Sequence, residues 1–303
     1  LACRTTGELD AGAGRRTPIF SILRKNFVSE ALTLIAQISD LHIKANGRLS
    51  YKKVDTQAAL LRVIETLNRL TPRPDMVVIT GDLVDFGNAE EYQTLRTALR
   101  RLQLPYMLMA GNHDDRQQLR AAFPDHHYLQ RGETLNWQAR VKGVQLLALD
   151  SSVPQQPWGY VDEAQLAWLE EQLVREPQLP TLVMLHHPPL VSGIGHMDKQ
   201  PLRNPDALAA IIRQHPQVER VLSGHLHRSV QARFAGTLVC VAPGVSHQVA
   251  FDLSENGPAN FVLEPPGFLL HRWHPQQGMT THQCAIGDYP GPWPFYDANG
   301  LID

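Results

Sequence analysis

The feature that most constrains this fold is a set of five apolar runs, each followed closely by Asp, Asn or His. The runs cover residues 32–38, 76–80, 106–110, 181–185 and 218–222. The polar residues that follow them are Asp40 and His42, Asp82, Asn112 and His113, His186, and His225 and His227. Near-continuous apolar runs of this length are typical of parallel strands in a sheet that is covered on both faces.

The segments between these runs favour helices. Residues 55–70 and 90–102 carry apolar side chains at helical spacing, and 162–175 and 205–215 are predicted helices as well. Alternating strands and helices predict an α/β fold with a parallel sheet. Parallel strands deliver their carboxyl ends to one edge, so the polar residues are expected to meet there.

Composition narrows the class of partner. The chain has 303 residues, 43% of them apolar, and a formal net charge of −2. No overall basic field is available for nucleic acid or an anionic membrane surface. No apolar run approaches the roughly 20 residues that span a bilayer. Cys3, Cys240 and Cys284 form no disulfide framework, which favours reduced thiols in a cytoplasmic protein, although a pair between Cys240 and Cys284 stays open.

The chemistry of the polar set indicates a metal centre. Carboxylates, imidazoles and one amide oxygen suit Mn, Fe, Co or Zn. The absence of thiolates from the set argues against a structural zinc site. The set is too large for one ion, whereas two ions about 3.5–4 Å apart and bridged by a carboxylate would use it. In Asp40-x-His42 and His225-x-His227, alternate positions of an extended segment would point to the same side.

The order Asp-x-His, Gly-Asp, Gly-Asn-His-Asp, His-His-Pro, Gly-His-x-His resembles the calcineurin-like metallophosphoesterase superfamily, from about residue 34 to 250. Within it, the chain is similar to the bacterial glycerophosphodiesterase and class III cyclic-nucleotide phosphodiesterase group. That similarity rests on residues 112–115, 184–190, 243–249 and 291–293. The resemblance implies a four-layer α/β/β/α sandwich with a dinuclear site at one edge.

The resemblance also assigns the ligands. It implies one ion held by Asp40, His42 and His227, a second held by Asn112, His186 and His225, and a bridge formed by Asp82. His113 would lie over the substrate phosphate without binding metal. Asp114 would either orient His113 or cap the helix that follows. His187, His196 and His247 are candidates for the wall of the substrate pocket.

Departures from relatives narrow the substrate. Protein phosphatases of this superfamily carry Asp-Arg-Gly after the Gly-Asp block, and this chain has Asp85-Phe86-Gly87. The missing Arg argues against a phosphoprotein substrate. Purple acid phosphatases need a Tyr ligand where this chain has Asp85. A nuclease would normally show basic tracks or aromatic platforms for a strand, and the sequence suggests neither.

Charge favours a diester. Two divalent ions with the Asp40 and Asp82 carboxylates leave a net charge of about +2, or about +1 once a hydroxide is bound. That value matches a phosphodiester, which carries a single negative charge. The resemblance implies in-line attack by the metal hydroxide, with Asp82, Asn112 and His113 as catalytic residues. His113 would stabilise developing charge or protonate the leaving alkoxide.

The predicted function is therefore a dinuclear metal-dependent phosphodiesterase for small diesters. Glycerophosphodiesters come first and 3′,5′-cyclic AMP second. The alternatives are a phosphomonoesterase or nuclease on the same fold, and a non-catalytic scaffold, which the complete ligand set disfavours.

The predicted domains are a flexible extension at 1–30, a catalytic domain at 31–250, and a small C-terminal β annex at 251–303. Strands are expected at 230–234, 237–241, 268–273 and 279–284, and an exposed insertion at 254–267. The resemblance implies that the annex serves dimerisation or capping in a homo-oligomer.

Overall fold

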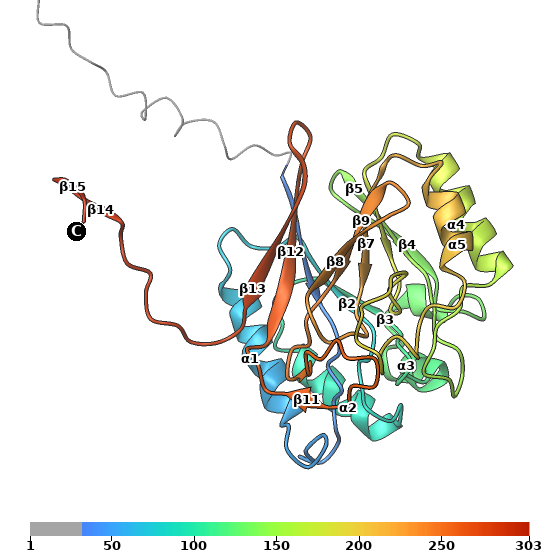
Figure 1. Ribbon diagram of the computed structural model, residues 1–303, viewed down its shortest axis with the longest axis horizontal. Helices are drawn as coiled ribbons and strands as arrows, with labels where there is room; N and C mark the ends of the chain where they lie inside the picture. Colours follow the sequence, from blue (N-terminus) through green and yellow to red (C-terminus); the bar gives the residue numbers. More distant parts are fainter. Residues whose placement is uncertain (1–31, 303) are drawn as a thin grey trace, which may run out of the picture.

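The computed structural model describes residues 32–302 and consists of two β-sheets stacked face to face with helices on both outer faces (Figure 1). The predicted extension at 1–30 lies outside the described residues. Across residues 32–302, no helix combines the length and the apolar character needed to cross a bilayer.

The first sheet has the strand order β13-β12-β1-β2-β3. Its strands are β1 (Thr33–Ile38), β2 (Met76–Thr80), β3 (Tyr106–Met109), β12 (Gly267–His274) and β13 (Gly278–Ala285). β1, β2 and β3 are parallel, as predicted, whereas β12 runs antiparallel to β1 and forms a hairpin with β13. The carboxyl-terminal ends of β1, β2 and β3 therefore lie at the same edge of this sheet.

The second sheet has the order β4-β5-β6-β7-β9-β8. Its strands are β4 (Trp137–Val141), β5 (Val144–Ala148), β6 (Thr181–Met184), β7 (Val218–Ser223), β8 (Val230–Phe234) and β9 (Thr237–Val241). β5, β6, β7 and β9 are parallel, and β4 and β8 are antiparallel strands at the two ends of the sheet.

The helices complete four layers. Within residues 32–302, the helices are α1 (Thr56–Arg69), α2 (Ala89–Leu99), α3 (Arg116–Ala122), α4 (Glu163–Arg175) and α5 (Pro205–Ile212), together with the 3-10 turn η2 (His127–Gln130). α1, α2 and α3 pack on the first sheet, and α4 and α5 pack on the second. A third apolar core lies between the sheets and includes Ile35, Leu182 and Leu269. The predicted α/β/β/α sandwich is confirmed.

The C-terminal strands differ from the expected annex. β12 and β13 belong to the first sheet, where β12 covers the edge of β1 that would otherwise be open. Side chains of β12 alternate between the layers: Phe268 packs on the helix side and Leu269 packs between the sheets. The predicted exposed insertion also carries a short strand, β11 (Phe261–Val262), which pairs with β10 (Gln248–Val249). The chain ends in a tail with the short strands β14 (Tyr296–Asp297) and β15 (Gly300–Leu301).

A buried polar network joins the sheets. Gln37 on β1 donates through Nε2 to Thr80 Oγ1 (3.0 Å) and to the Ser223 carbonyl (2.9 Å). Its Oε1 accepts from His271 Nε2 on β12 (3.1 Å). Burial, with a smaller effect of Arg220, lowers the pKa of His271 to about 3, so this imidazole is neutral in the folded protein at neutral pH. Every polar atom of the Gln37 side chain is thus satisfied away from water.

Stability should therefore depend on pH through His271. Its pKa is 6.5 when unperturbed and about 3 when folded, so the unfolded chain takes up its proton first as the pH falls. Between pH 7 and pH 5, the free energy of unfolding of the wild type should fall by ~2 kcal/mol more than that of His271→Gln. Chemical denaturation measures this, with the exposed His282→Gln as control. Parallel pH profiles for the wild type and His271→Gln would contradict the assignment.

Candidate metal centre

All five strand ends converge at one edge between the two sheets. Asp40 and His42 follow β1, Asp82 follows β2, and Asn112 and His113 follow β3. His186 comes after β6 and the pair His225 and His227 after β7. The predicted residues are thus brought together from both sheets, and their imidazoles and carboxylates are almost fully buried, except for the half-buried His113.

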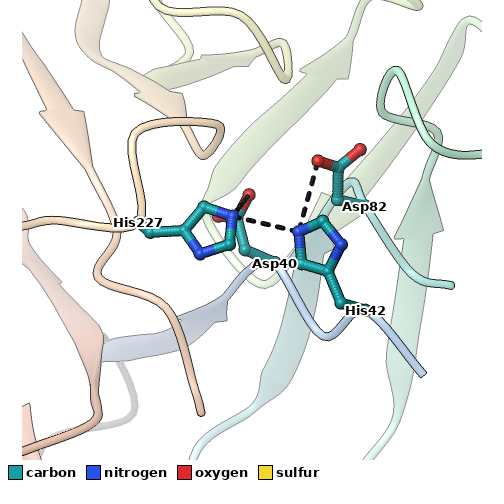
Figure 2. Close-up of side chains that lie close together, drawn as sticks. All are labelled: Asp40, His42, Asp82 and His227. Atoms are coloured by element: carbon teal, nitrogen blue, oxygen red, sulfur yellow. Dashed lines mark hydrogen bonds and ion pairs between the residues drawn. The ribbon is translucent and has the colours of Figure 1, made fainter. Parts of the chain in front are cut away.

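The first cluster consists of Asp40, His42, Asp82 and His227, whose polar atoms lie within 4.8 Å of one another. Figure 2 shows these side chains turned toward a common centre. His42 Nε2 is 3.0 Å from His227 Nε2 and 3.5 Å from Asp82 Oδ2. His227 Nε2 is 3.4 Å from Asp40 Oδ1.

The second cluster consists of Asp82, His186 and His225. His186 Nε2 is 3.3 Å from Asp82 Oδ2. His225 Nδ1 is 3.0 Å from Asn112 Oδ1, which brings the amide to the same place. Asp82 belongs to both clusters, which is the position expected of a bridging carboxylate.

The proton arrangement shows that the first-cluster histidines and His186 suit a cation. Nδ1 of His42 faces Asp85 Oδ1 (3.2 Å), Nδ1 of His186 faces the Thr80 carbonyl (2.8 Å), and Nδ1 of His227 faces the His247 carbonyl (3.4 Å). Carbonyls and carboxylates only accept, so each Nδ1 carries a proton, and in a neutral ring Nε2 then presents a lone pair. In the neutral rings, these lone pairs point toward one another and toward carboxylates, which is repulsive unless a proton or a metal cation lies between them.

In His225 the two ring nitrogens exchange roles, and Nδ1 is the nitrogen that faces the site. Its Nε2 donates to the Gln200 carbonyl (3.0 Å), which leaves a lone pair on Nδ1 facing the Asn112 oxygen. Two further buried atoms, Asp40 Oδ2 and His186 Nε2, have no hydrogen-bond partner among the described residues. The donor set therefore fits a divalent metal ion better than it fits protein hydrogen bonds alone.

The pKa values of Asp40 and His186 also indicate that the site favours a bound positive charge. Burial raises the pKa of Asp40 to about 6, against the opposing charge of His186. Although burial opposes protonation, the carboxylates of Asp82 and Asp40 raise the pKa of His186 to about 9. A bound cation would satisfy these groups without the proton.

The backbone at the ligand positions differs from the expected extended form. Left-handed φ values occur at Asp40 (57°), His42 (45°), Asp82 (49°), His225 (71°) and His227 (48°). The Asp-x-His and His-x-His pairs therefore turn back toward the sheet edge, and the alternation of an extended strand is not what aligns them. Non-glycine residues in this region carry strain, which folds retain mainly at functional sites.

The loop after β3 packs closely on Asp82. A Cβ at Gly111 would collide with the Asp82 backbone and carboxylate, so this position requires glycine. Asp114 accepts from the backbone N–H of Gly111 (2.8 Å) and of Leu83 (3.1 Å) and from the Tyr92 hydroxyl (2.8 Å). Both expected roles of Asp114 are wrong, because the α3 cap is Asp115 and the Asp114 carboxylate is occupied in fixing the two loops.

A cavity of about 820 Å³ opens over the clusters. His113, His196 and His247 line it, as predicted for pocket residues. His187 does not: it is fully buried behind the site, with Nδ1 2.9 Å from Ser151 Oγ and its ring packed 4.6 Å from that of His225. Sequence reasoning missed Tyr51, Lys53 and Phe261, which also line the cavity.

In the sequence, Asp85 is informative only because related families have other residues at or beside this position. In the structure it contacts two side chains at the site. Its Oδ1 accepts from His42 Nδ1, and its Oδ2 accepts from the buried Lys44 ammonium (2.8 Å). Although burial opposes ionisation, these hydrogen bonds lower the pKa of Asp85 to about 2. The carboxylate is therefore charged and fixes the proton of His42 on Nδ1.

The fold and this donor set define a metallophosphoesterase. The calcineurin-like phosphoesterase family model matches residues 33–229, and the chain belongs to that family.

Comparison with curated and solved proteins agrees. The chain is 39% identical to a probable glycerophosphodiester phosphodiesterase, GpdQ, of Arcobacter nitrofigilis, over 89% of this chain and 100% of the relative. It is 33% identical to a probable cyclic nucleotide phosphodiesterase of Rhodopseudomonas palustris, over 84% of this chain and 93% of the relative. A dimetal phosphatase from Danio rerio shares the fold with a TM-score of 0.58 at 13% identity, over 84% of this chain and 99% of that one.

Replacing Asp85 should weaken metal binding. Loss of a carboxylate that orients a histidine ligand typically costs about 10–100-fold in metal affinity, so Asp85→Ala should show a loss in this range. Asp85→Asn, which keeps an acceptor, should lose less. Titration of metal-free protein with Mn²⁺ measures both, with the exposed Glu90→Ala as control. Unchanged affinity in Asp85→Ala would contradict the role.

Proposed function

We propose that this protein is a dinuclear metal-dependent phosphodiesterase that hydrolyses small diesters. The observation that carries the proposal is the pair of buried His/Asp clusters that share Asp82. With two divalent ions, the carboxylates of Asp40 and Asp82 leave a net charge of about +2, which suits a singly charged diester. The relatives named glycerophosphodiester and cyclic nucleotide phosphodiesterase support this class.

The proposed ligand sets follow the two clusters. Asp40, His42 and His227 hold one ion, while Asn112, His186 and His225 hold the other, and Asp82 serves both. Mn, Fe, Co or Zn suit such donors. The bound ions supply Lewis acidity and lower the pKa of water. The four imidazoles and the amide are neutral ligands, which preserves the positive charge for the phosphate.

His113 is the proposed proton donor to the leaving alkoxide. Its backbone N–H donates to Asp82 Oδ1 (3.0 Å), which ties the loop to the shared carboxylate. Its Nδ1 donates to the Asp85 carbonyl (2.8 Å), so a protonated ring has only Nε2 left to offer. The ring is half-buried and lines the cavity. General acid help of this kind contributes roughly 10²–10⁴-fold.

Glycerophosphodiesters and 3′,5′-cyclic AMP are the proposed substrates. The alternative of a phosphomonoesterase is disfavoured because Lys53 is the sole Lys or Arg among the described residues that line the cavity, and a doubly charged ester would want further cations there. A nuclease is disfavoured because a single Lys is a poor match for a phosphate backbone. A scaffold would have no use for the strained ligand positions.

Assembly and location are further parts of the proposal. In Figure 1, the tail that ends in β14 and β15 extends away from the two sheets. Trp293 (72%), Phe295 (79%) and Tyr296 (69%) are largely exposed on it. Such side chains favour contact with a second copy, in a dimer or higher homo-oligomer.

The proposed catalytic unit spans 31–250, with β12 and β13 completing its sheet. Free thiols at Cys240 and Cys284 support a cytoplasmic location.

A substrate panel tests the function. Protein of measured metal content should hydrolyse bis(p-nitrophenyl) phosphate faster than p-nitrophenyl phosphate, because the charge of the site matches a diester. Glycerophosphoethanolamine and 3′,5′-cyclic AMP should be turned over, and EDTA should abolish every rate. Faster hydrolysis of the monoester would favour the phosphomonoesterase alternative, and the absence of any EDTA-sensitive turnover would favour the scaffold.

Two neighbouring substitutions separate metal binding from catalysis. Asn112→Ala should lower the occupancy of one ion and the rate together, because it removes a ligand while the fold stays intact. His113→Ala should lower the rate roughly 10²–10⁴-fold with both ions retained. Elemental analysis and steady-state rates measure both. Loss of metal from His113→Ala, or full metal content in Asn112→Ala, would reverse the two assignments.

A further inference from the structure

One wall of the cavity is built from three rings in mutual contact, which sequence reasoning did not single out together. Tyr51 lies 4.9 Å from Phe261, with their planes tilted by 31°. His247 meets the edge or face of both, at 5.3 Å from Tyr51 and 5.5 Å from Phe261. We call Tyr51, His247 and Phe261 the aromatic wall. All three line the same cavity as the metal clusters.

The aromatic wall begins one ring away from the metal centre. The His247 ring lies 4.6 Å from the ring of His227 and 5.7 Å from that of His42. A phosphate bound between the clusters would therefore direct one of its ester groups along this wall.

Tyr51 is held there by a costly turn. The Lys53 N–H donates to the Ser50 carbonyl (3.0 Å), and both central residues, Tyr51 (φ 49°) and Lys52 (φ 58°), are left-handed. Asn and Gly normally occupy such positions, because other side chains strain the backbone. The turn leaves Tyr51 half-exposed at the cavity and places Lys53 beside it. A strained turn that presents a large ring to a cavity indicates a binding role.

Phe261 is held from two sides. β11 pairs with β10, with Phe261 opposite Val249, and the Ala250 N–H donates to the Asn260 carbonyl (2.9 Å). Arg228, which follows His227, donates to the Val249 carbonyl (2.7 Å) and pairs with Glu264 (2.8 Å). The segment bearing Phe261 is therefore anchored to the metal-binding loop and is not a loose insertion.

The chemistry of the wall selects among ester groups. Of the described residues that line the cavity, Asp82 is the sole carboxylate, and it faces the histidine clusters. A cationic head group therefore finds no counter-charge and meets the Lys53 ammonium. Tyr51 and Phe261 stack on each other, so no gap between them encloses an ammonium group. The ring surfaces that they do not turn to each other suit a flat aromatic group, with the Asn260 amide and Lys53 available for its polar edge.

We propose that the aromatic wall is a subsite for a flat aromatic ester group of the diester, with a nucleobase as its natural occupant. The proposal rests on the proposed phosphodiesterase function and narrows it: diesters of nucleosides are preferred over those of glycerol with ethanolamine or choline. Tyr51 and Phe261 set this specificity, whereas the metal clusters treat all diesters alike.

Binding of two phosphomonoesters tests the subsite without turnover. AMP and glycerol 3-phosphate present the same phosphate to the metals and differ in what reaches the wall. Stacking of a base is worth roughly 5- to 150-fold in affinity, so calorimetry on the metal-loaded wild type should show AMP binding tighter by about 10-fold or more. Phe261→Ala and Tyr51→Ala should each reduce this preference, and Phe261→Tyr should keep it. Equal affinities in the wild type would overturn the proposal.

Phe261→Leu keeps most of the side-chain volume, so it is less disruptive to folding than Phe261→Ala. Because it removes the aromatic ring, it also separates the effect of stacking from that of apolar contact. It should lower kcat/KM for 3′,5′-cyclic AMP by a larger factor than that for glycerophosphoethanolamine. Leu253→Ala, exposed on the same segment and outside the cavity lining, should leave both unchanged. Equal losses on both substrates in Phe261→Leu would overturn the subsite. If no diester is hydrolysed but AMP is still preferred, the function fails and the subsite stands.

Discussion

The arrangement that the rest of the structure depends on is the convergence of imidazole Nε2 atoms on buried carboxylates. Asp82 lies 3.3 Å from His186 Nε2 and 3.5 Å from His42 Nε2, and neither contact is a good hydrogen bond in the tautomers that the surrounding carbonyls and carboxylates impose. With neutral imidazoles, such an arrangement is unfavourable in an apolar interior until a proton or a metal cation lies between the groups. The sheets, the strained turns and the packing of Gly111 all serve to hold these groups together in spite of that repulsion.

Much of this site was predictable, because its ligands follow the strands that are easiest to recognise. Apolar runs that end in Asp40, Asp82, Asn112, His186 and His225 indicate both the parallel strands and the edge at which they meet. Residue type then indicates a metal, since few other functions gather neutral imidazoles and carboxylates at one place. The left-handed backbone at these positions was not predictable, because Asp and His tolerate it without requiring it.

The remaining differences arise where contacts between distant segments decide. The strands β12 and β13 have sequences that suit any half-buried hairpin, and only the open edge of β1 determines where they pair. Asp114 and Asp115 are equivalent as helix caps in the sequence, and the free N–H groups of Gly111 and Leu83 decide between them. His187 follows His186 directly, yet its ring turns to Ser151 and away from the cavity. Asp85 belongs to no sequence motif that would reveal its role, and that role depends on its contacts with His42 and Lys44.

The pairing of β1 with β12 also affects the order in which the protein folds. Thr33 lies opposite Trp273, so the edge of β1 is covered only when a segment far along the sequence pairs with it. Contacts this distant in sequence form slowly, because a long loop must close before they contribute stability. Asp40 follows β1 directly, and the network that fixes Gln37 ends on β12 at His271. Assembly of the metal centre is therefore tied to the pairing of two strands that lie far apart in the sequence, and local folding around Asp40 alone does not complete it.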